Sequence, residues 1–471
     1  MPGVNMKENR ITSIFGSIKH IHMIGIGGIG MSGIADVLLR LDFRVSGSDT
    51  VESTITEHLR SLGAEIAIGH HRDNVVDPDI VVYSSAIKKD NPEYKQAERL
   101  GIKCIRRAEF LGMLLSVWPI RIGVAGTHGK TSTSSIIASA LTACGSHPSL
   151  FIGGIIKDLK TNALMDSKTC VIFEADEFDR TFLALPPTLA VITNVDADHL
   201  DIYKDLDDMK NAFLEYANSI PENGSVILCH DDPGACSLIP FIDRPWVSYG
   251  THPCADFRIS NITYKPGSAF DLYFKNELIG HFQVKETGLH HVLNASAALV
   301  TAYLMHLNIV DAGKGIFAYS GVERRCELRH QHGDVLFYDD YAHHPTEITA
   351  TLNALRTRFP ERRIIAIFQP HLYSRTRDFA DGFARSLQKA DKVYLVDIYP
   401  AREAPISGVN SDMIVHKMKE GGYTPVINIH HMSDVPAALI PEIRDGDLIL
   451  TLGAGDIWKV SDALYKEYHA R

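Results

Sequence analysis

The sequence predicts an α/β protein with largely parallel sheets. Strand-like apolar runs alternate with segments whose apolar residues recur at helical spacing throughout the 471 residues. Twice, a glycine-rich turn joins such a strand to such a helix. This alternation is typical of parallel strands with helical crossovers. Breaks in the pattern near residues 118 and 328 predict three regions, 1–118, 119–328 and 329–471.

The first region opens with a strand, a turn and a helix. Residues 20–26 are a buried-strand run, and glycines follow them. A helix is then predicted by apolar residues at its characteristic spacing, namely Ile34, Val37, Leu38 and Leu41. A second strand, 45–49, ends in Asp49.

The second region repeats this order. A strand at 121–125 follows Pro119, and the next helix is marked by Ile136, Ile137, Ala140 and Leu141. Further strands are predicted at 170–173 and 189–193. Between 257 and 284, short alternating runs with turn signals predict a small antiparallel insertion.

The third region again has strands between helices. Its apolar runs predict four strands, at 335–338, 364–368, 393–396 and 448–452.

Composition excludes several classes of protein. With 47 basic and 57 acidic residues the net charge is −10, which argues against a general nucleic-acid binder. There is no apolar run of membrane-spanning length, and residues 1–10 lack the apolar core of a signal peptide. The seven cysteines never form a CxxC pair, which favours reduced thiols over disulfides or a zinc–thiolate site. We therefore expect a soluble cytoplasmic protein.

The first glycine cluster, 25–30, has the form GxGxxG between a strand and a helix. Glycines let the backbone approach a diphosphate, whose charge is met by free N–H groups and the helix dipole. Asp49 lies where a ribose-binding carboxylate is expected. A tight turn without a ligand remains an alternative, and the motif alone does not specify NAD.

The second cluster is Gly126-Thr127-His128-Gly129-Lys130-Thr131. Amides of such a loop surround a β-phosphate, while the lysine reaches the β/γ oxygens and the threonine hydroxyl can bind Mg²⁺. The spacing is shorter than GxxxxGK[ST], because Val124 stands where the first glycine is expected. An accidental GKT remains the alternative.

Metal ligands are expected after two strands of this region. Glu174 follows the strand at 170–173, and His199 lies just beyond the strand at 189–193. Ligands gather at the carboxyl ends of parallel strands, so both side chains are predicted beside Thr131. Oxygen ligands with one imidazole suit Mg²⁺ or Mn²⁺. Both segments could instead be solvated acidic turns.

The third region presents polar residues after two strands, at 339–345 and at 369–377. Arginine there could hold a small anionic substrate. His343 and His344 are adjacent in an extended segment, so we favour hydrogen bonding or packing over a metal pair.

Together, these segments resemble the Mur ligase family, and within it the alanine-adding ligases of peptidoglycan synthesis. The resemblance rests on GIGGIGMSGIA (25–35), GTHGKTSTS (126–134), EADEFDRTF (174–182), NVDADHLDIY (194–203), GVERR (321–325), DDYAHHPTE (339–347) and QPHLYSRT (369–376). It implies an N-terminal Rossmann-like UDP-binding domain, a central ATPase of the P-loop type and a C-terminal Rossmann-like domain that binds the amino acid.

The resemblance also implies roles for individual residues. The UDP-sugar would be bound by Gly27, Gly28, Gly30, Asp49, Ser84, Ser85, Arg106 and Arg107. ATP would be bound by Gly126, Thr127, His128, Gly129, Lys130, Thr131, Ser132, Asn294, Arg325 and Asp340. Mg²⁺ or Mn²⁺ would be held by Thr131, Glu174 and His199, and alanine by Tyr341, His371 and Arg375. The catalytic group would be Lys130, Glu174, His199, Arg325 and Asp340.

Three positions bear on how far the resemblance extends. Family members more often have His-Asn where this chain has His290-His291, and some have arginine in place of Leu372. Related ligases that add later residues use a modified lysine near the place of Leu214. Its absence suits an alanine-adding member.

The implied activity is ATP-dependent ligation of L-alanine to the muramoyl carboxylate of UDP-N-acetylmuramate through an acyl phosphate, without nucleic-acid or membrane partners. The alternatives are a ligase that adds a preformed peptide to the same UDP-sugar, an NAD-dependent oxidoreductase and a non-catalytic nucleotide-binding regulator. The oxidoreductase leaves the second phosphate loop, Glu174 and His199 unexplained. The oligomeric state stays open.

Overall fold

The computed structural model describes residues 6–84, 86–167, 169–199, 202–264, 267–401 and 403–470. Their contacts divide the chain into two compact units. The first unit comprises residues 1–259, 272–280 and 294–319, and the second comprises 260–271, 281–293 and 320–471. Each unit is described by itself below.

The first sheet is parallel and five-stranded, in the order β3-β2-β1-β4-β5. Its strands are β1 (His20–Ile24), β2 (Arg44–Asp49), β3 (Glu65–Ile68), β4 (Ile80–Tyr83) and β5 (Lys103–Arg106). Its helices are α1 (Met6–Phe15), α2 (Ile29–Arg40), α3 (Thr54–Ser61), η1 (Arg72–Asn74), α4 (Pro92–Arg99) and α5 (Arg107–Leu115).

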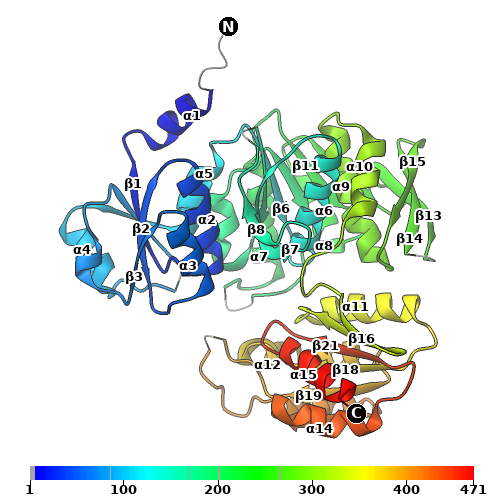
Figure 1. Cartoon of the computed structure of the whole chain (residues 1–471). Helices are drawn as coiled ribbons and strands as arrows, with labels where there is room; N and C mark the ends of the chain where they lie inside the picture. Colours follow the sequence, from blue (N-terminus) through cyan, green and yellow to red (C-terminus); the bar gives the residue numbers. More distant parts are fainter. Residues whose placement is uncertain are drawn as a thin grey trace. The chain divides into compact units, whose positions relative to one another are not determined.

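Helices cover both faces of this sheet. Alternate residues of β1 face opposite sides, so Met23 packs with Ile34 of α2 while Ile24 packs with Tyr94 of α4. Figure 1 shows α2 and α4 on opposite sides of the blue sheet. The carboxyl ends of the strands stay open for the first glycine loop.

The second sheet has ten strands, in the order β15-β14-β13-β12-β11-β10-β6-β9-β7-β8. They are β6 (Ile120–Ala125), β7 (Ser149–Ile156), β8 (Thr161–Leu164), β9 (Cys170–Ala175), β10 (Leu189–Ile192), β11 (Ser225–Cys229), β12 (Trp246–Gly250), β13 (Phe257–Thr263), β14 (Ser268–Phe274) and β15 (Glu277–Val284). The strands from β7 to β13 pair in parallel, and β8 pairs antiparallel with β7. Only two residues link β14 to β15, a connection that only antiparallel strands can make.

The helices of this part include α6, which follows the second glycine loop and packs on β6, β7 and β9. The segments are α6 (Lys130–Ala143), η2 (Phe178–Ala184), α7 (Leu206–Asn218), α8 (Pro233–Cys236), η3 (Ile239–Phe241), α9 (Leu289–Leu304) and α10 (Ile309–Ala318).

The second unit contains a six-stranded sheet, in the order β16-β17-β21-β18-β19-β20. The strands are β16 (Glu327–His332), β17 (Val335–Asp340), β18 (Ile364–Phe368), β19 (Lys392–Val396), β20 (Val426–His430) and β21 (Leu448–Leu452). All neighbours are parallel except β16, which is antiparallel to β17.

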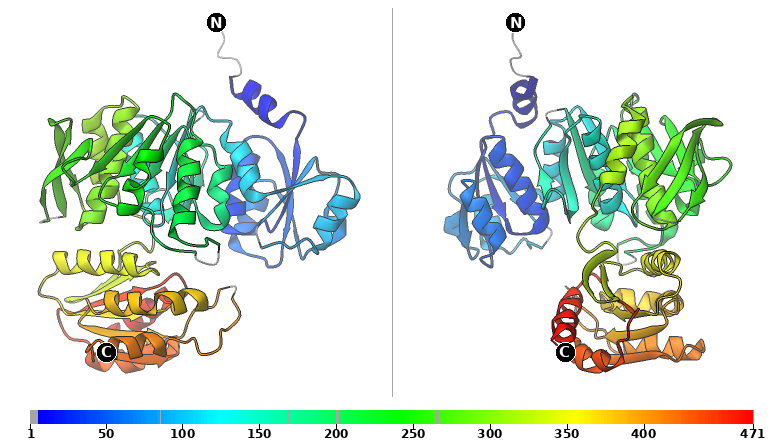
Figure 2. Two further views of the ribbon diagram at one scale, coloured as in Figure 1. Left: turned by 180° about the vertical axis from the view of Figure 1, so that it is seen from behind. Right: turned by 45° about the vertical axis from the view of Figure 1, so that its right-hand side comes forward.

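Two apolar cores lie on the two faces of this sheet. One core is covered by α11 (Pro345–Arg358), α12 (Tyr373–Leu387) and α13 (Asp412–Glu420), and the other by α14 (Val435–Leu439) and α15 (Trp458–His469), with η4 (Met432–Asp434) and η5 (Ile440–Glu442) beside α14. Figure 2 shows α15 in red on one face and the yellow and orange helices on the other.

The strands predicted from apolar runs are all present, and the α/β class is confirmed. The sequence did not predict the hairpin of β7 and β8 or the antiparallel edge strand β16. Glu174 lies within β9 rather than after it, because the ladder with β6 continues to Ala175. Within the described residues, no helix is both long and apolar enough to cross a lipid bilayer.

Candidate functional site

The first glycine loop is tied to the end of β2. The amides of Gly25 and Ile26 donate to Ser48 O at 2.8 and 3.0 Å. The amide of Gly27 donates to Asp49 Oδ2 at 2.8 Å. Gly25 has φ +81°, a conformation that favours glycine. Asp49 therefore holds the loop itself in this structure, whatever further contact it makes with a ligand.

Arginine lies at the same loop. A Cβ built on Gly30 would overlap Nη1 of Arg107, so this guanidinium rests directly on the start of α2. Ser84 lies close to Gly25, because its Oγ would be 3.1 Å from a Cβ atom placed on that glycine. A hydrogen bond with Tyr83 raises the pKa of Arg106. Ser85 lies outside the described residues.

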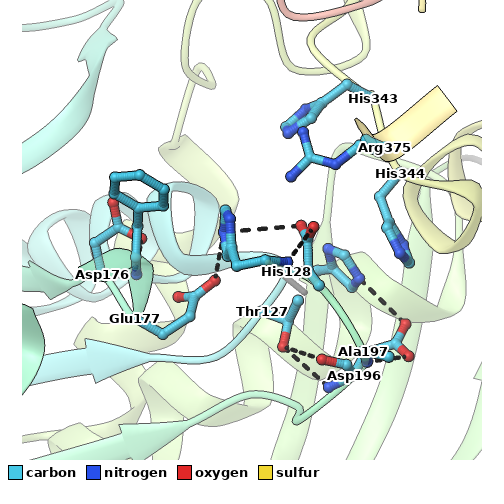
Figure 3. Close-up of polar contacts among 12 residues, drawn as sticks. Thr127, His128, Asp176, Glu177, Asp196, Ala197, His343, His344 and Arg375 are labelled. Carbon is cyan, nitrogen blue, oxygen red and sulfur yellow. Dashed lines mark hydrogen bonds and ion pairs between the residues drawn. The ribbon is translucent and has the colours of Figure 1, made fainter. Parts of the chain in front are cut away.

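The second loop joins β6 to α6 and requires glycine twice. Gly126 has φ +139° and Gly129 has φ +80°, and a Cβ on Gly126 would overlap Oγ1 of Thr193. The segment after β10 fixes the loop. Asn194 Oδ1 accepts from the His128 amide at 2.8 Å, and Thr127 Oγ1 accepts from the Asp196 amide at 2.9 Å. Figure 3 shows Thr127 and His128 both directed toward Asp196.

Lys130, the first residue of α6, is held by its own loop and by a carboxylate. Nζ donates to Gly126 O at 2.7 Å and to Glu177 Oε2 at 2.6 Å. Burial works to lower the pKa of Lys130, but the charges of Glu177, Asp176 and Glu174 outweigh it and raise that pKa. The lysine is therefore a fixed positive charge at the helix start.

Glu177 is a site residue that the sequence analysis missed. Its side chain is 1% exposed, and Oε1 lies 3.4 Å from Nε2 of His199. Among the described residues this oxygen has no hydrogen-bond partner, which is costly for a buried carboxylate. Tyr203 Oη donates to the Glu177 carbonyl at 2.6 Å. Glu177 thus lies between Lys130 and His199, and its only sequence signal was its place in the acidic run after β9.

The expected metal ligands have different surroundings. Glu174 Oε1 accepts from the amide of Gly153 at 2.6 Å, and its charge also acts on Lys130. His199 has φ +53°, which turns the backbone directly after Asp198. Thr131 is buried in the first turn of α6, with Ser132 half-buried next to it. Glu174 is thus placed by β9, His199 by the segment that follows β10, and Thr131 and Ser132 by the first turn of α6.

Asn294, on α9, lies at the same helix start. Its Oδ1 accepts from Thr133 Oγ1 at 3.1 Å and would be 3.4 Å from a Cβ on Gly129. Residue 291, where the family pattern has asparagine, is a half-buried histidine. Burial lowers the pKa of His290 to about 4 and lowers that of His291 well below its ordinary value, so both imidazoles are neutral.

The second unit gathers the residues expected around the nucleotide. Asp340, at the end of β17, accepts from the amides of Ala342 at 2.7 Å and Cys326 at 2.8 Å. Burial raises its pKa to about 6, and the charge of Arg325 opposes that shift. The Arg325 guanidinium lies over the Tyr341 ring, 5.0 Å from its centroid.

His371 and Arg375 meet in the same unit. Arg375 is 5% exposed, and its Nη1 lies 3.4 Å from Nδ1 of His371. A guanidinium only donates, so His371 accepts at Nδ1 and carries any ring hydrogen at Nε2. The His371 ring stacks on Tyr399 at 5.7 Å. Leu372 has φ +68° and precedes α12, so residue 372 acts through backbone geometry.

Chemically, the first unit combines two amide-lined loops at helix starts with a cluster of Lys130, Glu174, Glu177 and His199. Such loops bind phosphate groups, and such a cluster suits phosphoryl transfer. The second unit adds a buried carboxyl and two arginines, which can bind polar and anionic groups.

Comparison with known proteins agrees with this description. Three family models match, namely the Mur ligase family catalytic domain (residues 20–118), the Mur ligase middle domain (124–302) and the Mur ligase glutamate ligase domain (324–455). The chain is 43% identical to a UDP-N-acetylmuramate–L-alanine ligase of Salinibacter ruber over 97% of both chains. It is 41% identical to one of Geotalea uraniireducens over 96% of this chain and 99% of that one.

Solved structures give the same result. A UDP-N-acetylmuramate–alanine ligase of Thermotoga maritima superposes with a TM-score of 0.79 at 27% identity, covering 96% of this chain and 99% of that one. A murein peptide ligase of Psychrobacter arcticus, 23% identical, has a TM-score of 0.68 over 96% of this chain and 98% of that one, and shares the fold.

Proposed function

Since the chain belongs to the Mur ligase family, we propose that it joins L-alanine to the muramoyl carboxylate of UDP-N-acetylmuramate at the expense of ATP. The main support from the structure is the Lys130 cluster. A buried lysine at the start of α6 lies beside three acidic side chains, and a second phosphate-type loop lies in the same unit. A dehydrogenase would need only one such loop. The chemistry needs ATP because a carboxylate has no good leaving group.

We propose that the first loop binds the UDP diphosphate. The amides of Gly28 and Gly30 and the guanidinium of Arg107 lie where α2 begins, a place suited to an anion. Asp49, Ser84, Ser85 and Arg106 are proposed for the uridine and sugar ends. We propose that residues 1–118 form the domain that binds the UDP-sugar, residues 119–328 the domain that binds ATP, and residues 329–471 the domain that binds the amino acid.

The second loop, from Gly126 to Ser132, is proposed to bind the ATP phosphates. Lys130 Nζ is now paired with Glu177 Oε2. When the phosphates arrive, they offer Lys130 a second set of anionic partners. The lysine can then offset the repulsion between γ-phosphate and muramoyl carboxylate, which an in-line transfer requires. Asn294, Arg325 and Asp340 are proposed as further nucleotide contacts.

The residues fit a divalent cation. The buried Glu177 Oε1, which has no hydrogen-bond partner among the described residues, lies 3.4 Å from His199 Nε2. The charge of Glu174 acts on Lys130, and Thr131 follows Lys130 in the first turn of α6. We propose Thr131, Glu174 and His199 as holders of Mg²⁺ or Mn²⁺. Such an ion supplies positive charge that stabilises the transferring phosphoryl group. His199 would then orient the site rather than carry protons.

In the second unit, Arg375 is proposed to pair with the carboxylate of alanine, with Tyr341 and His371 beside it. The alanine amine attacks the acyl phosphate, and phosphate leaves from the tetrahedral intermediate. The free thiols and nucleotide substrates suit a cytoplasmic location.

The direct test is an assay with ATP, Mg²⁺, UDP-N-acetylmuramate and a panel of amino acids. ADP release that depends on alanine and on the UDP-sugar supports the proposal. Release that requires a preformed peptide would favour a peptide-adding ligase, and a nicotinamide absorbance change would favour an oxidoreductase. Carboxylate labelled with ¹⁸O should pass one label to inorganic phosphate. Label in ADP, or none in phosphate, would contradict the acyl phosphate.

A second assay addresses the alanine site. Arg375→Ala should raise the alanine KM strongly and leave UDP-sugar binding unchanged, because it removes a contact made equally in ground and transition states. An unchanged alanine KM would exclude Arg375 from the site.

A further inference from the structure

A buried polar network lies under the first glycine loop, on the face of the sheet covered by α4. In the register of β1 and β2, His22 is opposite Ser46 and Ile24 is opposite Ser48. Alternate strand residues share a face, so His20, His22, Ser46 and Ser48 all point to one side. They are 6%, 1%, 7% and 0% exposed. Polar side chains in this position need a partner.

The partner is Glu93, in the first turn of α4, which is 0% exposed. Its Oε2 accepts from Ser48 Oγ at 2.7 Å and from His22 Nε2 at 3.0 Å. Its Oε1 accepts from Asn74 Nδ2 at 2.7 Å and from the His71 amide at 3.1 Å. Four donors thus converge on one carboxylate.

The network continues away from Glu93 through His22. Ser46 Oγ lies 2.9 Å from His22 Nδ1 and 2.8 Å from His20 Nε2, and His20 Nδ1 lies 3.1 Å from the Asp77 carbonyl. A cavity of about 250 Å³ borders His20 and Ser46 of this row and also Asn74, which donates to Glu93.

The row of polar side chains ends on Glu93. Its two ends are acceptors, the Asp77 carbonyl and the Glu93 carboxylate, and four hydrogen bonds join them through His20, Ser46 and His22. Glu93 thus ties α4 to a continuous polar row on β1 and β2.

The charge balance favours an ionised Glu93. Burial works to raise the pKa of Glu93, but hydrogen bonds from His22, Asn74 and Ser48 outweigh it and hold the pKa below its ordinary value. Burial also lowers the pKa of His20.

This network reaches the substrate loop through two residues. The Ser48 side chain binds Glu93, while the Ser48 carbonyl accepts from the amides of Gly25 and Ile26. The next residue, Asp49, accepts from the amide of Gly27. Fixing Ser48 thus fixes both anchors of the glycine loop.

We propose that Glu93 is a positioning residue for the UDP-sugar: through its hydrogen bonds to Ser48 and to the His22–Ser46–His20 row, it fixes the end of β2 that holds the glycine loop. This inference rests on the proposed function of that loop. Glu93 contacts no substrate atom itself. Its effect should fall on UDP-sugar affinity and leave ATP affinity unchanged, because the second loop is anchored separately by Asn194 and Asp196.

The test compares Glu93→Gln with Ser48→Ala and with Glu98→Gln, the same chemical change at an exposed position of α4. Glutamine places an NH₂ against two of the four donors, so Glu93→Gln should weaken UDP-N-acetylmuramate binding about tenfold. Ser48→Ala cuts the same connection and should act in the same direction. The double variant should be little worse than the worse single variant. ATP KM should stay within about twofold in all of them, and Glu98→Gln should resemble the parent.

A second readout needs no substrate. In Glu93→Gln the amide hydrogens of Gly25 and Ile26 should exchange with solvent faster, while those of α6 keep their rates. If the parent enzyme does not bind UDP-N-acetylmuramate, the proposed function fails, and this exchange measurement still tests Glu93. Unchanged exchange at Gly25 and Ile26 would overturn the inference. Equal losses of UDP-sugar and ATP affinity would also overturn it. If Glu93→Gln does not fold, Ser48→Ala decides.

Discussion

The two glycine loops of the first unit share a place in the chain but differ in how their charge is balanced. Each joins a buried strand to a helix, at Gly25–Gly30 and at Gly126–Lys130. In the first loop an amide is met by a carboxylate, Asp49 Oδ2, at 2.8 Å. In the second, a lysine within the loop is met by a carboxylate, Glu177 Oε2, at 2.6 Å.

This difference suggests different tasks. We propose that the first loop, which has no charge of its own, binds a diphosphate through backbone amides and the guanidinium of Arg107, which lies against Gly30. We propose that the second loop brings the charge of Lys130 to the transferring phosphoryl group. We therefore expect substitutions in the first loop to change the affinity for the UDP-sugar, and substitutions in the second loop to change kcat.

The largest effect is expected from Lys130→Ala. Removing a charge that acts mainly in the transition state should lower kcat by about 100-fold or more. ADP release with saturating UDP-sugar measures this. Lys204→Ala removes an exposed lysine nearby and serves as the control. If Lys130→Ala turned over at nearly the rate of the parent enzyme, Lys130 would have no part in phosphoryl transfer.

A smaller effect, in KM rather than kcat, is expected from Gly30→Ala. The new Cβ would displace the end of the Arg107 side chain, which is flexible, so the fold should survive. The UDP-sugar KM should rise about tenfold, as for a lost contact to a charged group. Arg107→Ala should act similarly, and the two changes together should not add. Additive effects would show that Gly30 and Arg107 act independently.

Asp49→Asn should cost less. The amide oxygen can still accept from Gly27, so the loop keeps its anchor and loses only the negative charge proposed to face the uridine and sugar end of the ligand. We expect a change of about threefold in the UDP-sugar KM, in line with one partly solvated charge. A loss of kcat without a change in KM would contradict the assignment of the first loop to affinity.

The last effect, on stability rather than on kinetics, concerns the buried carboxyl of Asp340. Asp340 has its pKa raised by burial to about 6. Because the native state then binds more protons than the unfolded state between the ordinary and the raised pKa, stability should fall as pH rises through about 4 to 6 and change little above that. The contribution is at most about 3 kcal/mol.

Thermal unfolding of the parent protein and Asp340→Asn across this pH range measures the difference in slope. A carboxyl ¹³C titration of Asp340 gives its midpoint directly. A midpoint near 4 would mean that water reaches this strand end.

Strand-end residues could be predicted from the sequence because an apolar run fixes where a strand stops. Glu174 and Asp340 were located in this way to within two residues, since β9 extends to Ala175 and β17 to Asp340 itself. Glu177 could not be, because it reaches Lys130 through η2, where Asp179 and Arg180 both adopt φ of 53°, a conformation that no local pattern indicates. Nothing in the local sequence distinguishes Glu93 from other acidic residues in the first turn of a helix. Its burial depends on the packing of β1, β2, η1 and α4 against one another. No local sequence pattern reveals such tertiary packing.

The hydrogen bonds from Lys130 Nζ to Gly126 O and Thr127 O, at 2.7 and 3.3 Å, have a consequence for nucleotide binding. They hold the lysine side chain against the loop carbonyls. We propose that the ATP phosphates bind to a loop that is braced in this way, so the conformational entropy lost on association is small. Nucleotide association should accordingly be fast, and affinity should be tuned through dissociation.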